Sequence, residues 1–78
     1  MTETITQYIE KEILSGQGNI QLAADEDLLT TGLIDSLGIM KLIAFLEEKF
    51  AVTIPPEDMT IENFLTVQTI ENYIDSLQ

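Results

Sequence analysis

Apolar residues recur at helical spacing in the first part of the chain. They occupy positions i, i+3, i+4 and i+8 and so share one face of a helix; they are Ile5, Tyr8, Ile9 and Ile13. Thr2 or Thr4 is suited to cap the start of this helix, because a threonine hydroxyl can accept a hydrogen bond from a free backbone amide of the first turn. We expect the Gly-Gln-Gly-Asn stretch at residues 16–19 to end it.

The clearest helical period runs from residue 36 to residue 50. Asp35 and Ser36 are both favourable at a helix N-terminus. Past residue 50 the helix has to stop before Pro55 and Pro56, because proline lacks the amide hydrogen that a helix interior needs. The apolar stripe of the predicted helix consists of Ile39, Leu42, Ile43, Leu46 and Phe50.

Two further helices are predicted nearer the C-terminus. Residues 57–65 have room for one short turn with Thr60 as its cap, and Thr66 caps a last helix. These elements predict an all-α fold, a small four-helix bundle of three main helices plus a short third helix. A chain of 78 residues has room for one core, so we expect a single domain over residues 1–78. The inward residues of the last helix are Val67, Ile70, Ile74 and Leu77.

A long connection without a helical period joins the first predicted helix to the second. Connections of about twenty residues are uncommon in compact domains and are usually functional. We expect its scattered apolar residues to pack this long loop onto the helices. These residues are Ile20, Leu22, Leu28, Leu29, Leu33 and Ile34.

The charge balance narrows the range of functions. Fourteen acidic residues against three lysines give a net charge of −11. Three cations cannot neutralise a run of phosphates, which argues against a nucleic-acid binder. Without His or Cys the usual ligands of zinc and haem are missing, so we expect no metal site. There is no apolar run near the roughly 20 residues of a membrane span and no signal-peptide pattern, so we expect a cytoplasmic monomer.

The residue inventory also argues against an enzyme. Ser36 lies beside Asp35, but the chain has no His to act as the base of a serine hydrolase. The acids at residues 25–27 lack the later ligands of a calcium loop and are better explained as a solvated stretch. The neighbouring carboxylates of Glu47 and Glu48 fall on a predicted helix surface with no evident pocket. We therefore expect no catalytic residues.

One segment combines a long apolar loop with a serine at a helix start. Taken alone, Asp35 and Ser36 are explained by helix capping, which contributes about 1 kcal/mol. The sequence Gly-Leu-Ile-Asp-Ser-Leu at residues 32–37, however, resembles the phosphopantetheine attachment site of acyl and peptidyl carrier proteins. The similarity covers nearly the whole chain, from the first helix through residues 46–50 to the last helix.

This resemblance implies a set of roles and partners. Ser36 would carry a covalent 4'-phosphopantetheine derived from coenzyme A, and Asp35 would help a phosphopantetheinyl transferase to hold magnesium beside the serine. Further partners would be an adenylating acyl or aminoacyl ligase and a downstream dehydrogenase or synthase. A helix N-terminus suits the phosphodiester, because free amides and the helix dipole favour an anion there.

Two departures from the fatty-acid carriers concern the second helix. Gly38 and Lys41 stand where those carriers have acids, which would weaken docking to fatty-acid enzymes. We expect Gly38 to accept aspartate without loss of stability. With Lys41, the residues Leu37, Met40 and Ala44 form a mainly apolar outer patch that is either a partner-docking surface or ordinary covering of neighbouring side chains.

Phe45 of the second predicted helix is off the inward stripe and is expected to pack under the long loop.

The C-terminal half indicates the carrier subclass. The length of residues 56–66 and the aromatic Phe64 resemble free-standing carriers loaded by an adenylating ligase. We therefore favour a discrete carrier of an aminoacyl or small acyl thioester in specialised biosynthesis. A carrier of fatty-acid biosynthesis is the alternative, and an unmodified helical adaptor is a remote one.

Overall fold

The first helix begins at the very start of the chain and changes its pitch midway. The computed structural model describes residues 1–14 and 21–78. Helix α1 spans Thr2–Tyr8 and continues as a π-helical turn, η1, over Ile9–Ile13. The prediction of a threonine cap is wrong, because Met1 occupies the N-cap position and no side chain caps the helix. The predicted terminator at residues 16–19 lies outside the described residues.

Helix α2 spans Ser36–Phe50, as predicted. The Asp35 side chain caps it by accepting a hydrogen bond from the Gly38 amide at 2.8 Å. The helix ends at Ala51, which adopts a left-handed conformation with φ 53°. The last helical residue is therefore Phe50, as predicted, and the helix stops before the prolines. In the segment that follows, the Ile54 amide donates a hydrogen bond to the Glu47 carboxylate at 2.8 Å.

The C-terminal half contains one short and one long helix. A 3-10 turn, η3, spans Pro56–Asp58, α3 spans Ile61–Phe64 and α4 spans Val67–Leu77. Both predicted caps are confirmed: the Thr60 side chain accepts from the Asn63 amide, and Thr66 forms a capping box with Thr69. Leu77 does not face the core as expected, because it lies at the free end of α4 and is 37% exposed.

The long loop is packed down, as predicted. Leu28 and Ile34 are buried in it. Its backbone is also fastened to distant parts of the chain: the Leu28 amide donates to the Leu65 carbonyl at 2.7 Å, and the Gln68 amide donates to the Ala24 carbonyl at 2.9 Å. The predicted loop residue Ile20 lies outside the described residues.

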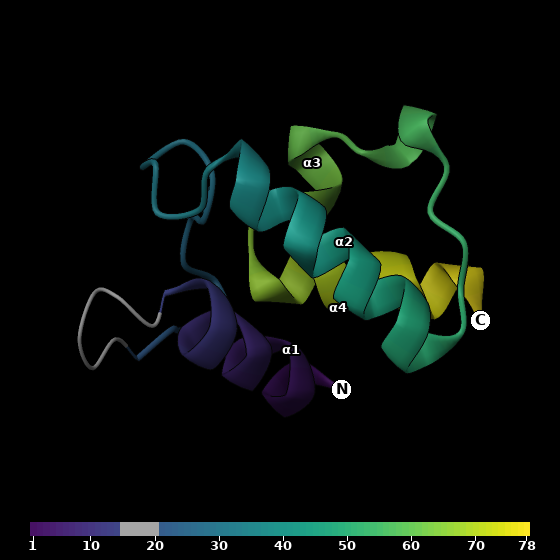
Figure 1. The fold of residues 1–78 in the computed structure, drawn as a ribbon, viewed down its shortest axis with the longest axis horizontal. Coiled ribbons are helices and arrows are strands. Elements are labelled where there is room, and N and C mark those ends of the chain that lie inside the picture. Colours follow the sequence, from purple (N-terminus) through teal and green to yellow (C-terminus); the bar gives the residue numbers. More distant parts are fainter. Residues whose placement is uncertain (15–20) are drawn as a thin grey trace.

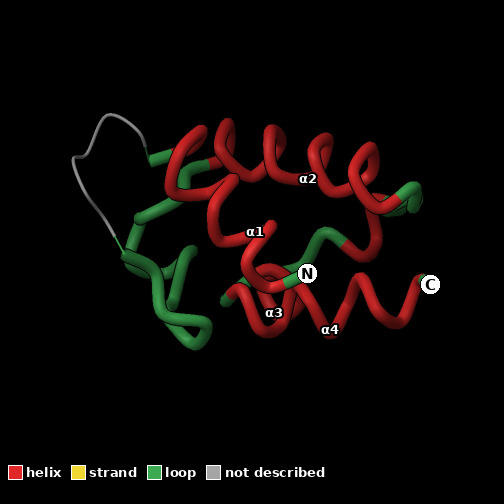
Figure 2. The backbone as a smooth tube through the Cα atoms, turned by 90° about the horizontal axis from the view of Figure 1, so that it is seen from below, coloured by secondary structure: helices red, strands yellow, loops and turns green. Residues whose placement is uncertain are grey.

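The elements are arranged as a small helical bundle (Figures 1 and 2). Helix α1 packs against α4, η1 packs against α2, and α3 leads directly into α4. Across residues 1–14 and 21–78 the regular elements are all helical, so the all-α prediction with a short third helix is confirmed. None of the described helices combines the length and apolar character needed to cross a membrane. The core consists of Ile5, Ile9, Leu14, Leu28, Ile34, Leu42, Ile43, Leu46, Ile54, Phe64, Val67, Ile70 and Ile74.

Candidate functional site

Ser36 is the first residue of α2, and its side chain is exposed. The first amides of a helix have no partner within the helix, so they face outward beside this residue. The carboxylate of Asp35 is turned to the Gly38 amide and fixes the start of the helix. The cap is therefore Asp35, and the Ser36 hydroxyl is not needed to hold the helix end.

A tight turn in the long loop delivers the chain to Ser36. The Asp27 side chain accepts hydrogen bonds from the amides of Leu29 at 3.0 Å and Thr30 at 2.9 Å, and from the Thr30 hydroxyl. The hydrogen bonds from Thr30 hold the pKa of Asp27 below its usual value. At Gly32 the backbone takes φ +77°, a conformation that glycine adopts without strain. The acidic stretch thus contributes a loop-closing residue, which was missed because it was interpreted only as solvated surface.

Gly38 lies one half-turn beyond Ser36 and is buried. A Cβ atom at this position would come within 2.8 Å of Ile34 Cγ2 and 3.1 Å of Ile13 Cγ2. Both contacts come from β-branched side chains, which have little rotamer freedom to move aside. The expectation that aspartate would be tolerated here is therefore wrong, because the helix start is covered by the loop and by η1.

A largely apolar groove of about 600 Å³ opens beside Ser36. The loop forms one wall, the first turns of α2 form the floor, and α3 closes the far side. Ile61, which is 61% exposed, belongs to this groove and was not identified from the sequence. Its only signal was an exposed position for an isoleucine directly after the helix cap Thr60. The lining residues are Leu29, Gly32, Ile34, Asp35, Ser36, Ile39, Met40 and Ile61.

The segment that contains this site also shows which protein family the chain belongs to. Residues 4–74 match the family model described as "Phosphopantetheine attachment site". The chain belongs to this family. Its members carry a group on phosphopantetheine rather than catalyse a reaction, so this protein is a carrier with phosphopantetheine as its cofactor.

Named relatives of this carrier come from streptococci. A D-alanyl carrier protein of Streptococcus suis (strain 05ZYH33) is 34% identical over 68 residues, which cover 87% of this chain and 82% of the relative. A D-alanyl carrier protein of Streptococcus pyogenes serotype M5 (strain Manfredo) is 29% identical over 76 residues, covering 97% of this chain and 92% of the relative. The resemblance to free-standing aminoacyl-type carriers is thereby confirmed.

The surroundings of Ser36 fit a phosphodiester-linked group. The hydroxyl is exposed at a helix N-terminus, where free amides and the dipole favour an anion. Ser36 and Asp35 both border the groove, whose apolar walls can contact the uncharged part of a bound group. This side of α2 thus offers an exposed hydroxyl with an apolar surface next to it.

The four residues named as a docking patch are all exposed on the outer side of α2. Leu37 is 62% exposed and Met40 is 68% exposed, while Lys41 and Ala44 are also at the surface. Only Met40 borders the groove beside Ser36. Phe45, which was expected to pack under the long loop, instead stacks its ring on Tyr8 of α1 with 3.9 Å between the ring centroids.

A hydrogen bond behind α3 holds the far wall of the groove. The Tyr73 hydroxyl of α4 donates to Asp58 Oδ2 at 2.6 Å, and the Asp58 carbonyl accepts from Asn63 Nδ2 at 2.8 Å. Burial, together with the hydrogen bond and negative charge of Asp58, raises the pKa of Tyr73 to about 12. Tyr73 was not singled out from the sequence, because it lies beside the inward stripe of α4.

Proposed function

We propose that this carrier takes phosphopantetheine on Ser36 and holds an aminoacyl or small acyl group that an adenylating ligase supplies. The observation that carries the proposal is the exposed Ser36 hydroxyl at the N-terminus of α2, inside the segment that matches the family. When bound, the group supplies a terminal thiol for a thioester. The chain itself has no Cys, so none of its own side chains offers a thiol.

Each residue at the site has a distinct part in this proposal. Ser36 Oγ would bond to the phosphorus that carries pantetheine in coenzyme A; the pyrophosphate linkage would break, adenosine 3',5'-bisphosphate would leave, and the hydroxyl proton would pass to a base of the transferase. Asp35 fixes the helix start and would help the transferase to hold its magnesium. The groove between the loop and α3 gives a partner enzyme an apolar surface close to the attachment point. Met40 and Ile61 are the exposed apolar residues that such a partner contacts.

An aminoacyl cargo is supported by the relatives, which are named D-alanyl carrier proteins. The exposed Lys41 supports a role outside fatty-acid biosynthesis, since it stands where the fatty-acid carriers have an acid that their enzymes recognise. We propose a specialised pathway in which a dehydrogenase or synthase then acts on the loaded carrier. Gly38, the other departure from the fatty-acid carriers, is buried and therefore does not contribute to a difference in docking.

Intact-mass measurement tests the attachment residue. The carrier is incubated with coenzyme A, magnesium and a broad-specificity phosphopantetheinyl transferase. Wild type and the control Ser76→Ala, which changes an exposed serine of α4, should gain the mass of phosphopantetheine, whereas Ser36→Ala should gain nothing. An unmodified wild type would favour the adaptor alternative. Modification of Ser36→Ala would place the arm elsewhere.

The cargo is tested on the modified carrier. Candidate adenylating ligases are assayed with D-alanine, other amino acids and small organic acids, and we expect loading with an amino acid. Transfer from a fatty-acid malonyl transferase is measured in parallel on wild type and Lys41→Glu. Poor transfer to wild type and better transfer to Lys41→Glu supports the proposal. Equally good transfer to both would favour the fatty-acid alternative.

A further inference from the structure

The second flank of α2, which faces α1, contains a different kind of recess. Its volume is about 310 Å³, and Lys11 and Lys49 are among the residues that line it. Lys41 and Lys49 are eight residues apart on α2, so with Phe45 between them they follow one side of the helix. These are the three lysines of the chain, and we call Lys11, Lys41 and Lys49 together the lysine face. The remaining lining residues are Thr4, Gln7, Tyr8, Glu12 and Phe45.

An aromatic pair makes the floor of this recess rigid. The rings of Tyr8 and Phe45 are stacked with an interplanar angle of 12°. The Tyr8 hydroxyl donates to the Lys41 carbonyl at 3.3 Å, which fixes α1 along α2 at the middle of the lysine face. Stacked rings of this kind stabilise helix packing. Lys11 and Lys49 therefore border a fixed surface rather than a flexible one.

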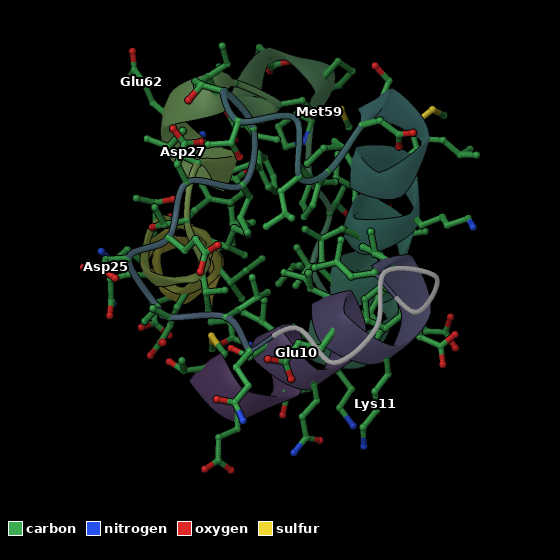
Figure 3. The ribbon with its side chains drawn as sticks, turned by 90° about the vertical axis from the view of Figure 1, so that its left-hand side faces the viewer. Glu10, Lys11, Asp25, Asp27, Met59 and Glu62 are labelled. Atoms are coloured by element: carbon green, nitrogen blue, oxygen red, sulfur yellow. The ribbon has the colours of Figure 1, made fainter. Side chains whose placement is uncertain are left out.

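The lysine face stands out against the charge of the rest of the molecule. The chain carries −11, yet among the described residues that line the recess beside Lys11 and Lys49 the one carboxylate is that of Glu12. Figure 3 shows that Lys11 points outward from η1, while Asp25, Asp27 and Glu62 lie on the other side of the molecule. Glu10, from the same turn as Lys11, accepts instead from the Leu22 amide of the loop at 2.8 Å. The acids Asp25, Asp27 and Glu62 thus lie away from Lys11 (Figure 3), while Glu12 remains next to it.

We infer that the lysine face is a docking site for an acidic segment of a partner protein. Charge complementarity identifies the occupant, because carboxylates are attracted to this face and repelled by the rest of the surface. A small free anion is held weakly, since one exposed ion pair contributes little. A segment with several carboxylates contacts the three lysines at once and covers the aromatic floor as well. An anionic membrane is disfavoured by the net charge of −11.

Docking at the lysine face orients the carrier. A partner that contacts the acidic surface with basic residues and the lysine face with carboxylates can bind in one direction only. The lysine face and the groove beside Ser36 lie on two flanks of the same helix, α2. A partner that covers both flanks of α2 can therefore contact both surfaces. The orientation about α2 then determines where the Ser36 side chain points. Docking itself does not depend on modification of Ser36.

Binding of a model peptide to the full chain tests this inference. The probe is acetylated hexaglutamate, and a neutral Gly-Ser hexapeptide serves as its control. With hexaglutamate, NMR of the ¹⁵N-labelled protein should show amide shifts confined to the lysine face and its aromatic floor: Tyr8, Lys11, Lys41, Phe45 and Lys49. The neutral peptide should cause none. The shifts should weaken as salt is added. The Ser36→Ala protein should bind equally well, so failure here is separate from failure of the proposed attachment.

Matched variants separate the lysines from the overall charge. The pair Lys11→Gln with Lys49→Gln and the pair Gln21→Glu with Gln68→Glu both lower the net charge by two. The lysine pair should bind hexaglutamate about tenfold more weakly, and the glutamate pair should change binding by less than about twofold. Equal weakening in both pairs would overturn the inference, as would shifts outside the lysine face and its aromatic floor, or no binding at all. Reproduction of the shifts by inorganic phosphate, or lysine-dependent binding to phosphatidylglycerol vesicles without peptide binding, would also overturn it.

Discussion

The two flanks of α2 differ in how they are built and in what they offer. The flank with Ser36 is walled by an irregular loop and a one-turn helix, and its groove is mainly apolar. The flank with Phe45 is formed by two helices, and its recess is bordered by lysines and hydrogen-bonding groups. A single helix of 15 residues therefore presents two surfaces of different chemistry.

The two flanks of α2 are held in place by different kinds of contact. The Ser36 flank is defined by caps and turns: Asp35 fixes the helix start, and Asp27 fixes the loop. The other flank is defined by the packing of Tyr8 on Phe45, with exposed charges at its edge. We expect changes to caps and close approaches to affect attachment, and changes to the charges to affect the choice of partner.

The largest effect on stability is expected for Gly38→Asp. The new side chain would collide with Ile34 from the loop and Ile13 from η1, and its carboxylate would be buried. We expect a loss of about 3 kcal/mol in the free energy of unfolding, measured by urea denaturation. Gly32→Ala is the control, because a Cβ there meets nothing within 4 Å and only the φ of +77° opposes it. Its loss should be about 1 kcal/mol. A Gly38→Asp protein as stable as wild type would show that the loop and η1 move aside at little cost in free energy.

The next largest loss of stability is expected for Phe45→Ala, which tests the flank of α2 that faces α1. It removes the ring that stacks on Tyr8 from a partly buried position. We expect a loss of about 2 kcal/mol in the free energy of unfolding. Modification of Ser36 should proceed at the wild-type rate under folding conditions, because the groove beside Ser36 lies on the other flank. A matching fall in the modification rate would mean that the two flanks are not independent.

Tyr73→Phe tests the far wall of the Ser36 groove. Loss of the hydrogen bond to Asp58 should lower the free energy of unfolding by about 1 kcal/mol at neutral pH. The pKa of Tyr73 is raised to about 12, so the folded protein holds this proton more tightly than the unfolded chain does. The stabilisation is therefore complete below pH 10 and is lost as the pH rises through about 12. Denaturation curves of both proteins should converge across that interval, and a constant difference would contradict the assigned role.

Met40→Ala should have the smallest effect on stability and the clearest effect on docking. The side chain is 68% exposed, so the free energy of unfolding should change by less than about 0.5 kcal/mol. If the Ser36 flank is the surface that the loading ligase contacts, the rate of loading should fall about tenfold. Leu77→Ala, another exposed apolar residue, is the control and should load normally. Normal loading of Met40→Ala would make this side chain ordinary helix covering.

The sequence predicted those parts of the fold that depend on local patterns. The bounds of α2 and the capping roles of Asp35, Thr60 and Thr66 follow from helical periodicity and from side chains that bond to their own neighbouring amides. The burial of the loop residues Leu28 and Ile34 follows from their apolar character. The motif at residues 32–37 pointed to the family that the comparison with known families confirms.

The features that escaped prediction depend on contacts between distant segments. Gly38 needs to be glycine because Ile13 and Ile34 approach it, and Phe45 packs on Tyr8 because α1 crosses α2 there. Ile61 became part of the site only because the loop and α3 meet across α2. Helical periodicity describes one element at a time and contains no information about which elements meet.

The two backbone hydrogen bonds that fasten the long loop have a consequence for fragments and for folding order. They join Leu28 to Leu65 and Ala24 to Gln68, so residues that precede α2 are tied to residues that follow it. Helix α2 can begin to form from local contacts, but these pairs meet only after a long stretch of chain has closed on itself. A fragment that ends after α2 would therefore contain the serine and its cap without the groove beside them. The groove beside Ser36 therefore needs both halves of the chain, because its loop wall precedes α2 and Ile61 follows it.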